Sequence, residues 1–157
     1  MIYNFSKEVV EYFKQAGWHK KRNVKETLKI PTKEYDYPPF ILDFLYEYGG
    51  LVVGEEGKGI NVAKVSINFD PNQAKYQNEE DQTFYYYSDL IKKQIYPLGI
   101  QSDHFYLGID KDGCIYNLND YCVYIANSLE TGLHDLLTGY CKKLIQLDED
   151  TAEWISV

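Results

Sequence analysis

Short apolar segments separated by turn residues fill the second half of the chain, and this pattern constrains the fold most. The segments 96–100 and 105–109, with two more between residues 114 and 126, are typical of β-strands. Asp112-Gly113 is a strong hairpin signal, because both central positions of a type I′ turn need positive φ. The sequence therefore predicts a meander of antiparallel strands in this part of the chain.

Helical patterns flank this block. Ser6 can cap a first helix that Gly17 ends, and Pro38-Pro39 stand where a second helix can begin. Residues 84–93 also have helical spacing. Asn127 can cap a last helix through a capping box. The apolar face and the end of that helix are Leu129, Leu133, Leu136, Leu137 and Gly139.

The remaining segments are less regular. An alternation over residues 62–69 predicts a strand whose core-facing residues are Ala63, Val65, Ile67 and Phe69. Residues 70–82 predict a polar loop, and residues 22–35 predict a short helix that Pro31 interrupts. An amphipathic segment, 142–155, closes the chain. The order of elements predicts one α+β domain over residues 1–157, with N-terminal helices, a central meandering, mainly antiparallel sheet and a C-terminal helix.

Charge restricts the partners of this chain. Its 157 residues carry a formal net charge of −8, with a sequence pI of about 4.8. Such a surface should repel nucleic acid and anionic membranes and attract basic proteins. The sixteen tyrosines suit either a contact surface or the rim of a core, because each ring is apolar and each hydroxyl is polar.

The sequence also indicates where the protein works. The first residues lack the basic region and apolar run of a targeting segment, and no stretch reaches the ~20 apolar residues that span a bilayer. The cysteines, Cys114, Cys122 and Cys141, are odd in number and show no C-x-x-C spacing. We therefore expect a cytoplasmic protein with reduced thiols.

Motifs that could support catalysis or metal binding are incomplete. His19, His104 and His134 form no paired-ligand motif. The glycine-rich segment 54–59 lacks the Lys-Ser/Thr ending of a phosphate loop, and 110–113 lacks the later ligands of a calcium loop. The sequence thus predicts a protein that is not an enzyme and uses no metal or cofactor.

A partner-binding surface is the better-supported hypothesis. A helix cannot bury the four consecutive aromatics of 84–87 on one stripe, so one or two should be exposed unless they wrap over a sheet edge. The acidic runs 79–81 and 148–150 are either solvated or form a patch for a basic partner. The candidate partner-binding residues are Glu55, Glu56, Glu79, Glu80, Asp81, Tyr85 and Tyr86.

The order of motifs along the chain resembles the SUKH superfamily of bacterial toxin-immunity proteins, and most closely its third family. The matching segments are Ala16-Gly17-Trp18 with Arg22, Phe40-x-x-x-Phe44-Leu45-x-x-Tyr48-Gly49-Gly50-Leu51, Tyr96-Pro97-Leu98-Gly99, Leu107-Gly108-Ile109-Asp110-x-x-Gly113-x-Ile115-Tyr116, and Ser128-Leu129 through Leu136-Leu137-Thr138-Gly139. The segment 27–37 departs from the family pattern at Pro31. The resemblance implies an α+β immunity domain that binds a cognate polymorphic toxin inside the producing cell, commonly a nuclease or another nucleic-acid-directed enzyme, and it supplies no catalytic residues.

Three hypotheses follow. In the first, the chain neutralises a basic, nuclease-like toxin by covering its active site with an acidic, aromatic-bearing surface, without contacting nucleic acid or membrane. In the second, it is a cytosolic adaptor or regulatory protein-binding module without a toxin partner, since a fold does not fix a function. In the third, it is an enzyme whose site the motifs do not reveal, which would require a pocket with converging titratable groups.

Overall fold

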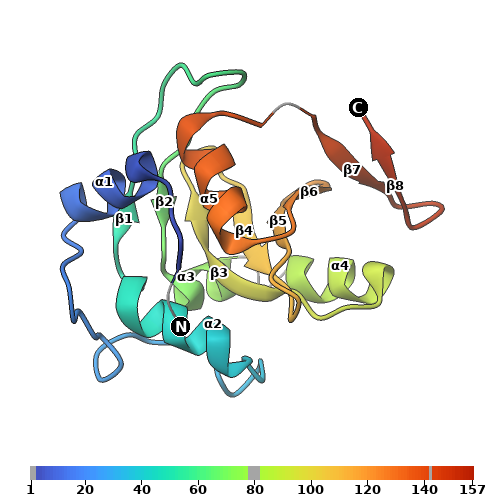
Figure 1. The fold of residues 1–157 in the computed structure, drawn as a ribbon. Helices are drawn as coiled ribbons and strands as arrows, with labels where there is room; N and C mark the ends of the chain where they lie inside the picture. Colours follow the sequence, from blue (N-terminus) through green and yellow to red (C-terminus); the bar gives the residue numbers. More distant parts are fainter. Residues whose placement is uncertain (1–2, 78–81, 142) are drawn as a thin grey trace.

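One antiparallel sheet runs through the molecule (Figure 1). The computed structural model describes residues 3–77, 82–141 and 143–157. Within them, eight strands are hydrogen-bonded in chain order, which confirms the predicted meander. The strands are β1 (Val52–Val53), β2 (Ile67–Asn68), β3 (Tyr96–Gln101), β4 (Tyr106–Ile109), β5 (Ile115–Leu118), β6 (Cys122–Ala126), β7 (Ile145–Asp148) and β8 (Glu153–Ser156).

The helices complete an α+β fold, as the sequence predicts. In the described residues they are α1 (Lys7–Gln15), α2 (Pro39–Tyr48), α3 (Pro71–Gln77), α4 (Thr83–Ile91) and α5 (Leu129–Thr138). The side chain of Ser6 caps α1, and Pro39 is the first residue of α2, as expected. Gly139, with φ of +70°, ends α5.

Aromatic side chains join the first two helices to the start of the sheet. The rings of Phe13 on α1 and Tyr48 on α2 lie 4.5 Å apart, and Phe69 beside β2 lies 5.3 Å from Phe44. Phe13, Phe44 and Phe69 are at most 1% exposed. Much of the high aromatic content therefore fills this end of the core.

Helices cover both faces of the sheet. Gly108 pairs with Tyr116, so both project on one face, and a Cβ at Gly108 would lie 3.3 Å from the Phe84 ring of α4. Ile115, one residue before Tyr116, projects to the other face, where a Cβ at Gly132 of α5 would lie 2.7 Å from it. The two glycines permit these close approaches, and they place α4 and α5 on opposite sides of the sheet.

The β4–β5 hairpin forms where Asp112-Gly113 predicts it, but its turn is not type I′. Only Gly113 has positive φ, at +90°. The turn has no second residue with positive φ and is held instead by the side chain of Asp110, which is fully buried. One of its carboxylate oxygens accepts the backbone N–H groups of Asp112 and Cys114, and the other accepts the Tyr116 hydroxyl. A three-residue loop with a single left-handed glycine results.

The cap of α5 lies one residue later than predicted. Ser128, rather than Asn127, is the N-cap, and its hydroxyl oxygen accepts the backbone N–H of Thr131 at 3.1 Å. Serine and asparagine serve equally well at this position, so local preference could not decide between adjacent residues.

This difference gives a testable expectation. The Ser128→Ala variant should lose about 1 kcal/mol of unfolding free energy, because the first turn of α5 loses an acceptor. Asn127→Ala is the matched control and should leave stability unchanged. Chemical denaturation of both variants measures the effect, and a larger loss in Asn127→Ala would contradict the assignment.

Two predicted segments differ from the structure, and a third, residues 62–69, differs in part. The polar loop expected over 70–82 contains α3, which begins at Pro71 after Asp70, whose carboxylate accepts the backbone N–H of Gln73. Residues 22–35 form turns and no helix. The alternation over 62–69 holds from Val65 onward, with Val65, Ile67 and Phe69 buried, whereas Ala63 is exposed.

The final amphipathic segment forms a β-hairpin beyond α5. Strands β7 and β8 pair with each other, β7 also pairs with β6, and β8 is an edge strand exposed along its length. The apolar residues of β8 alternate between the two faces: Trp154 stacks on Tyr116 on the α4 side, and Ile155 projects to the other side. The hairpin thus extends both faces of the sheet past the helices.

The three cysteines are unpaired, and Cys122 and Cys141 are buried. Burial raises the pKa of all three thiols, that of Cys122 to about 12.

Among the described residues, no helix combines the length and the apolar character that crossing a membrane requires.

Candidate partner-binding site

The predicted contact residues do not form one cluster. Glu79, Glu80 and Asp81 lie outside the described residues. Glu55 and Glu56 belong to the loop between β1 and β2, at the top of Figure 1, whereas Tyr85 and Tyr86 lie on α4 at the lower right. The two described groups are therefore separate surfaces.

Glu55 is held within its own loop. Its carboxylate pairs with Lys64 Nζ at 3.0 Å, and the same ammonium donates to the Tyr12 hydroxyl at 3.2 Å. The backbone of Gly57 also bridges to Lys64 across the loop. The glycine-rich segment thus forms an irregular hairpin that packs against α1.

The aromatic run on α4 divides as the sequence predicts. Phe84 and Tyr87 are buried, whereas Tyr85 is 41% and Tyr86 48% exposed. The Tyr85 ring stacks on Tyr35 at 5.3 Å with an interplanar angle of 8°. A buried neighbour therefore fixes the orientation of an exposed ring.

Tyr86 connects α4 to the C-terminal hairpin. Its hydroxyl donates to Glu149 Oε1 at 2.6 Å, and this hydrogen bond is the largest cause of the raised pKa of Tyr86. The Tyr87 hydroxyl lies 3.4 Å from Glu149 Oε2. Trp154 is 37% exposed and stacks on Tyr116 on this side of the sheet. We call this surface the α4–hairpin face; its residues are Tyr85, Tyr86, Glu149, Asp150 and Trp154.

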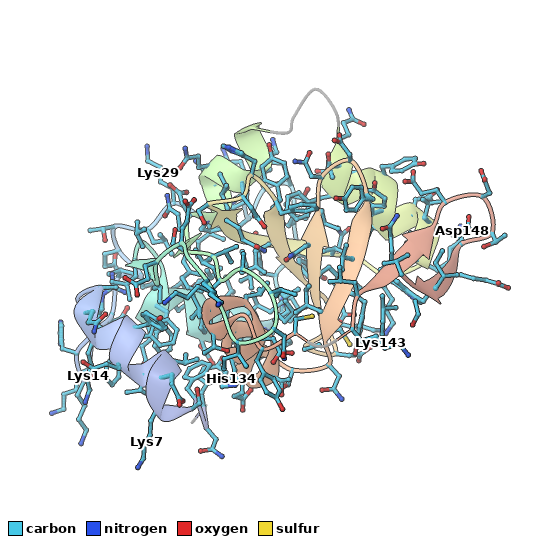
Figure 2. The ribbon with its side chains drawn as sticks, turned by 90° about the horizontal axis from the view of Figure 1, so that it is seen from above. Lys7, Lys14, Lys29, His134, Lys143 and Asp148 are labelled. Atoms are coloured by element: carbon cyan, nitrogen blue, oxygen red, sulfur yellow. The ribbon has the colours of Figure 1, made fainter. Side chains whose placement is uncertain are left out.

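Charge is distributed unevenly along the chain and around this face. Residues 144–157 contain four acids and no lysine or arginine, whereas residues 1–33 hold eight of the sixteen Lys and Arg. Figure 2 shows Asp148 at one end of the molecule and Lys7 and Lys14 of α1 at the other. The α4–hairpin face is therefore aromatic and is acidic on its hairpin side, whereas Tyr85 also lines a hollow with Lys92 and Lys93.

A second surface is a groove that sequence reasoning missed. It lies between the end of α5, the β1–β2 loop and the sheet face opposite α4, with a volume of about 270 Å³. Its exposed large apolar residues are Val62, Tyr121 and Leu144, between 41% and 44% exposed. We call it the α5 groove. Its residues come from distant segments, so no local pattern marks it.

Two carboxylates lie in the α5 groove. Burial raises the pKa of Asp103 and of Asp135. The charges of His104 and His134 lower the pKa of Asp103 and of Asp135, respectively, and the charge of Glu56 raises that of Asp103. Glu56 is thus close enough to add to the negative potential here. Among the described residues that line the groove there is no lysine, arginine or histidine.

The histidines remain apart in the fold. His134 Nδ1 lies 3.0 Å from the Ser6 hydroxyl between α1 and α5, and His19 contacts the carbonyl of Lys20. Within the described parts of the chain, no three His, Cys, Asp or Glu side chains gather in a way that could hold a metal ion. The α4–hairpin face and the α5 groove instead present aromatic rings, aliphatic groups and carboxylates, which are suited to binding a protein.

Comparison with known proteins assigns the chain to a family. The SUKH-3 immunity protein family matches residues 5–139. The match covers the sheet through β6 and ends at the glycine after α5, so the β7–β8 hairpin lies outside it. Neither the curated proteins nor the solved structures that we compared gave a match. Because the family match spans most of the chain, the protein belongs to the SUKH-3 immunity protein family.

Proposed function

We propose that the protein acts in the cytoplasm of the producing cell, where it neutralises a basic, nuclease-like toxin by covering the toxin's active site with the α4–hairpin face. Family membership supports the general toxin-immunity role. One observation carries the choice of surface: exposed Tyr85 and Tyr86 lie beside an acidic hairpin and are tied to it through the Tyr86–Glu149 hydrogen bond. In this proposal the chain works by binding and performs no catalysis.

Aromatic and charged residues make different contributions to a protein interface. Tyrosine and tryptophan rings bury large areas with few rotatable bonds, so they anchor a complex. Carboxylates around them raise the rate of encounter with a cationic partner and contribute less to final affinity. A nuclease must bind polyanionic substrate, so its active site tends to be cationic. An acidic, aromatic face is complementary to such a site.

The direct test is co-expression of the chain with the protein encoded beside it, followed by pull-down and a growth-rescue assay. A stable complex with restored growth is the expected result. If both proteins fold but neither bind nor rescue growth, the toxin-immunity role of this chain fails, and an adaptor role becomes the better hypothesis.

Charge reversal tests the steering role of the acidic run before α4. The Glu79→Lys/Glu80→Lys variant should associate with the toxin about tenfold more slowly at low salt, with a weaker salt dependence. Glu8→Lys/Glu11→Lys makes the same change in charge on α1, where both side chains are exposed, and should have a smaller effect. Stopped-flow association rates at several salt concentrations distinguish the two. Equal slowing in both variants would show that only net charge matters.

A further inference from the structure

The α5 groove has the composition of a site for an apolar side chain. Val123 and Ile125 of β6 lie at its sheet side, and Leu136 of α5 lines it as well. At its margin, Val62, Tyr121 and Leu144 expose apolar surface in three different segments. Apolar surface that gathers in a concave site, rather than as scattered single residues, marks an interaction site.

A buried amide pair adds a polar contact point. Asn117, which is 8% exposed and lines the groove, accepts a hydrogen bond from Gln101 through its side chain. The other oxygen of this pair, Gln101 Oε1, is buried without a partner within the described residues. The Asn117 amide also carries an NH2 donor, which suits a backbone carbonyl of an occupant.

The carboxylates restrict the charge of that occupant. Asp103 and Asp135 both line the groove, and no lysine or arginine among the described lining residues pairs with them there. The charges of His104 and His134 act on them from outside the lining, and that of Glu56 adds to the negative field at Asp103. An anionic occupant would be repelled, whereas a lysine or arginine beside the apolar side chain would find a carboxylate within the groove. The same groove of a second copy would bring carboxylate against carboxylate, so complementarity favours a basic partner over self-pairing.

The β5–β6 turn contacts α4 and also lines the groove on the opposite face of the sheet. The Tyr87 hydroxyl of α4 lies 3.4 Å from the carbonyl of Asn119 in the β5–β6 turn, and Tyr121 in the same turn lines the groove. A partner seated on the α4–hairpin face can therefore reach the groove around this turn. One toxin could bind both surfaces.

We propose that the α5 groove receives an apolar side chain of the cognate toxin, flanked in the toxin by a lysine or arginine that pairs with Asp103 or Asp135. This inference rests on the proposed function, since it identifies a second contact of the same complex. It predicts that the toxin presents a segment in which a leucine or an aromatic residue is adjacent to a basic one.

The test compares groove variants in the toxin complex. Leu144→Arg should raise the Kd by about 30-fold or more, as expected for an anchoring pocket that has been filled and given a repelling charge. Val52→Arg is the matched control, because Val52 is 59% exposed on strand β1 and does not line the groove. Asp103→Asn/Asp135→Asn removes the charges with little change in volume, and it should raise the Kd about tenfold and weaken its salt dependence. Thermal unfolding confirms that each variant folds.

A toxin-free probe tests the same chemistry independently. Phenethylammonium combines an apolar ring with a cation, and NMR titration should shift the signals of groove residues such as Val123 and Ile125. Phenylacetate, with a similar ring and the opposite charge, should shift them much less. Equal shifts with both probes, or shifts confined to other surfaces, would overturn the assigned ligand chemistry.

The outcomes separate the two proposals. If no toxin complex forms with the unaltered chain, the proposed function fails. If the complex forms and both groove variants keep full affinity, the groove inference alone is overturned. A concentration-dependent dimer that Leu144→Arg abolishes would assign the groove to a second copy and would also overturn it.

Discussion

The Asp110→Ala variant should lose about 3 kcal/mol of unfolding free energy, the largest single-residue effect expected outside the apolar core. The Asp110 carboxylate is fully buried and accepts the Tyr116 hydroxyl at 2.7 Å and the backbone N–H groups of Asp112 and Cys114 at 2.8 and 3.0 Å. Lys93 Nζ lies 3.9 Å away. Alanine would leave the Tyr116 hydroxyl buried without its acceptor, and it would remove the side chain that shapes the β4–β5 turn.

Urea denaturation followed by circular dichroism measures this loss. Asp112→Ala is the control, because Asp112 pairs with the same Lys93 at 2.7 Å but is exposed, so its removal should change stability little. Asp110→Asn keeps one acceptor oxygen and should fall between the two. Similar losses in Asp110→Ala and Asp112→Ala would show that the ion pair with Lys93, and not the buried hydrogen bonds, stabilises the hairpin.

The Tyr85→Ala/Tyr86→Ala variant should weaken toxin binding about 30-fold or more, the largest effect expected on binding from changes to the α4–hairpin face. Both rings are exposed in the free protein, where Tyr85 stacks on Tyr35 and Tyr86 is hydrogen-bonded to Glu149. Because these contacts already restrict the rings, little side-chain conformational entropy is lost on binding. Alanine removes the anchors and leaves the surrounding carboxylates in place. Most of the change should therefore appear in the dissociation rate.

Surface plasmon resonance with the immobilised toxin measures both rates. Tyr46→Ala serves as the control, since Tyr46 is a half-buried tyrosine on α2, where it lies under the Lys25 ammonium. Unchanged dissociation in the α4 variant, with its fold intact by thermal unfolding, would remove the α4–hairpin face from the proposed interface.

Local signals predicted the sheet well. The strands from β3 to β6 follow one another through short turns, so the pattern that forms each strand also indicates its neighbour. The short α3 was missed because its residues show no apolar stripe, although Asp70 followed by Pro71 is a helix-start signal. The polar composition of residues 70–82 favours a loop more strongly than this single cap favours a helix.

The binding surfaces could be predicted only in part. The exposure of Tyr85 and Tyr86 follows from helix geometry, because four consecutive aromatics cannot share one buried stripe. The contact of Tyr86 with Glu149 joins residues 63 positions apart and depends on a hairpin that the sequence indicated only as amphipathic. The α5 groove combines segments from residue 62 to residue 144, and such a combination exists only once the sheet and α5 are packed.

The state of the cysteines makes selective chemical labelling of this protein practical. Because burial raises the pKa of all three thiols, little of the reactive thiolate form exists at neutral pH. A new cysteine at an exposed site such as Asp150, in the turn between β7 and β8, would react with a maleimide well before the native ones. A fluorophore could then report on the α4–hairpin face without removal of Cys114, Cys122 or Cys141, so the core that contains them would keep its native packing.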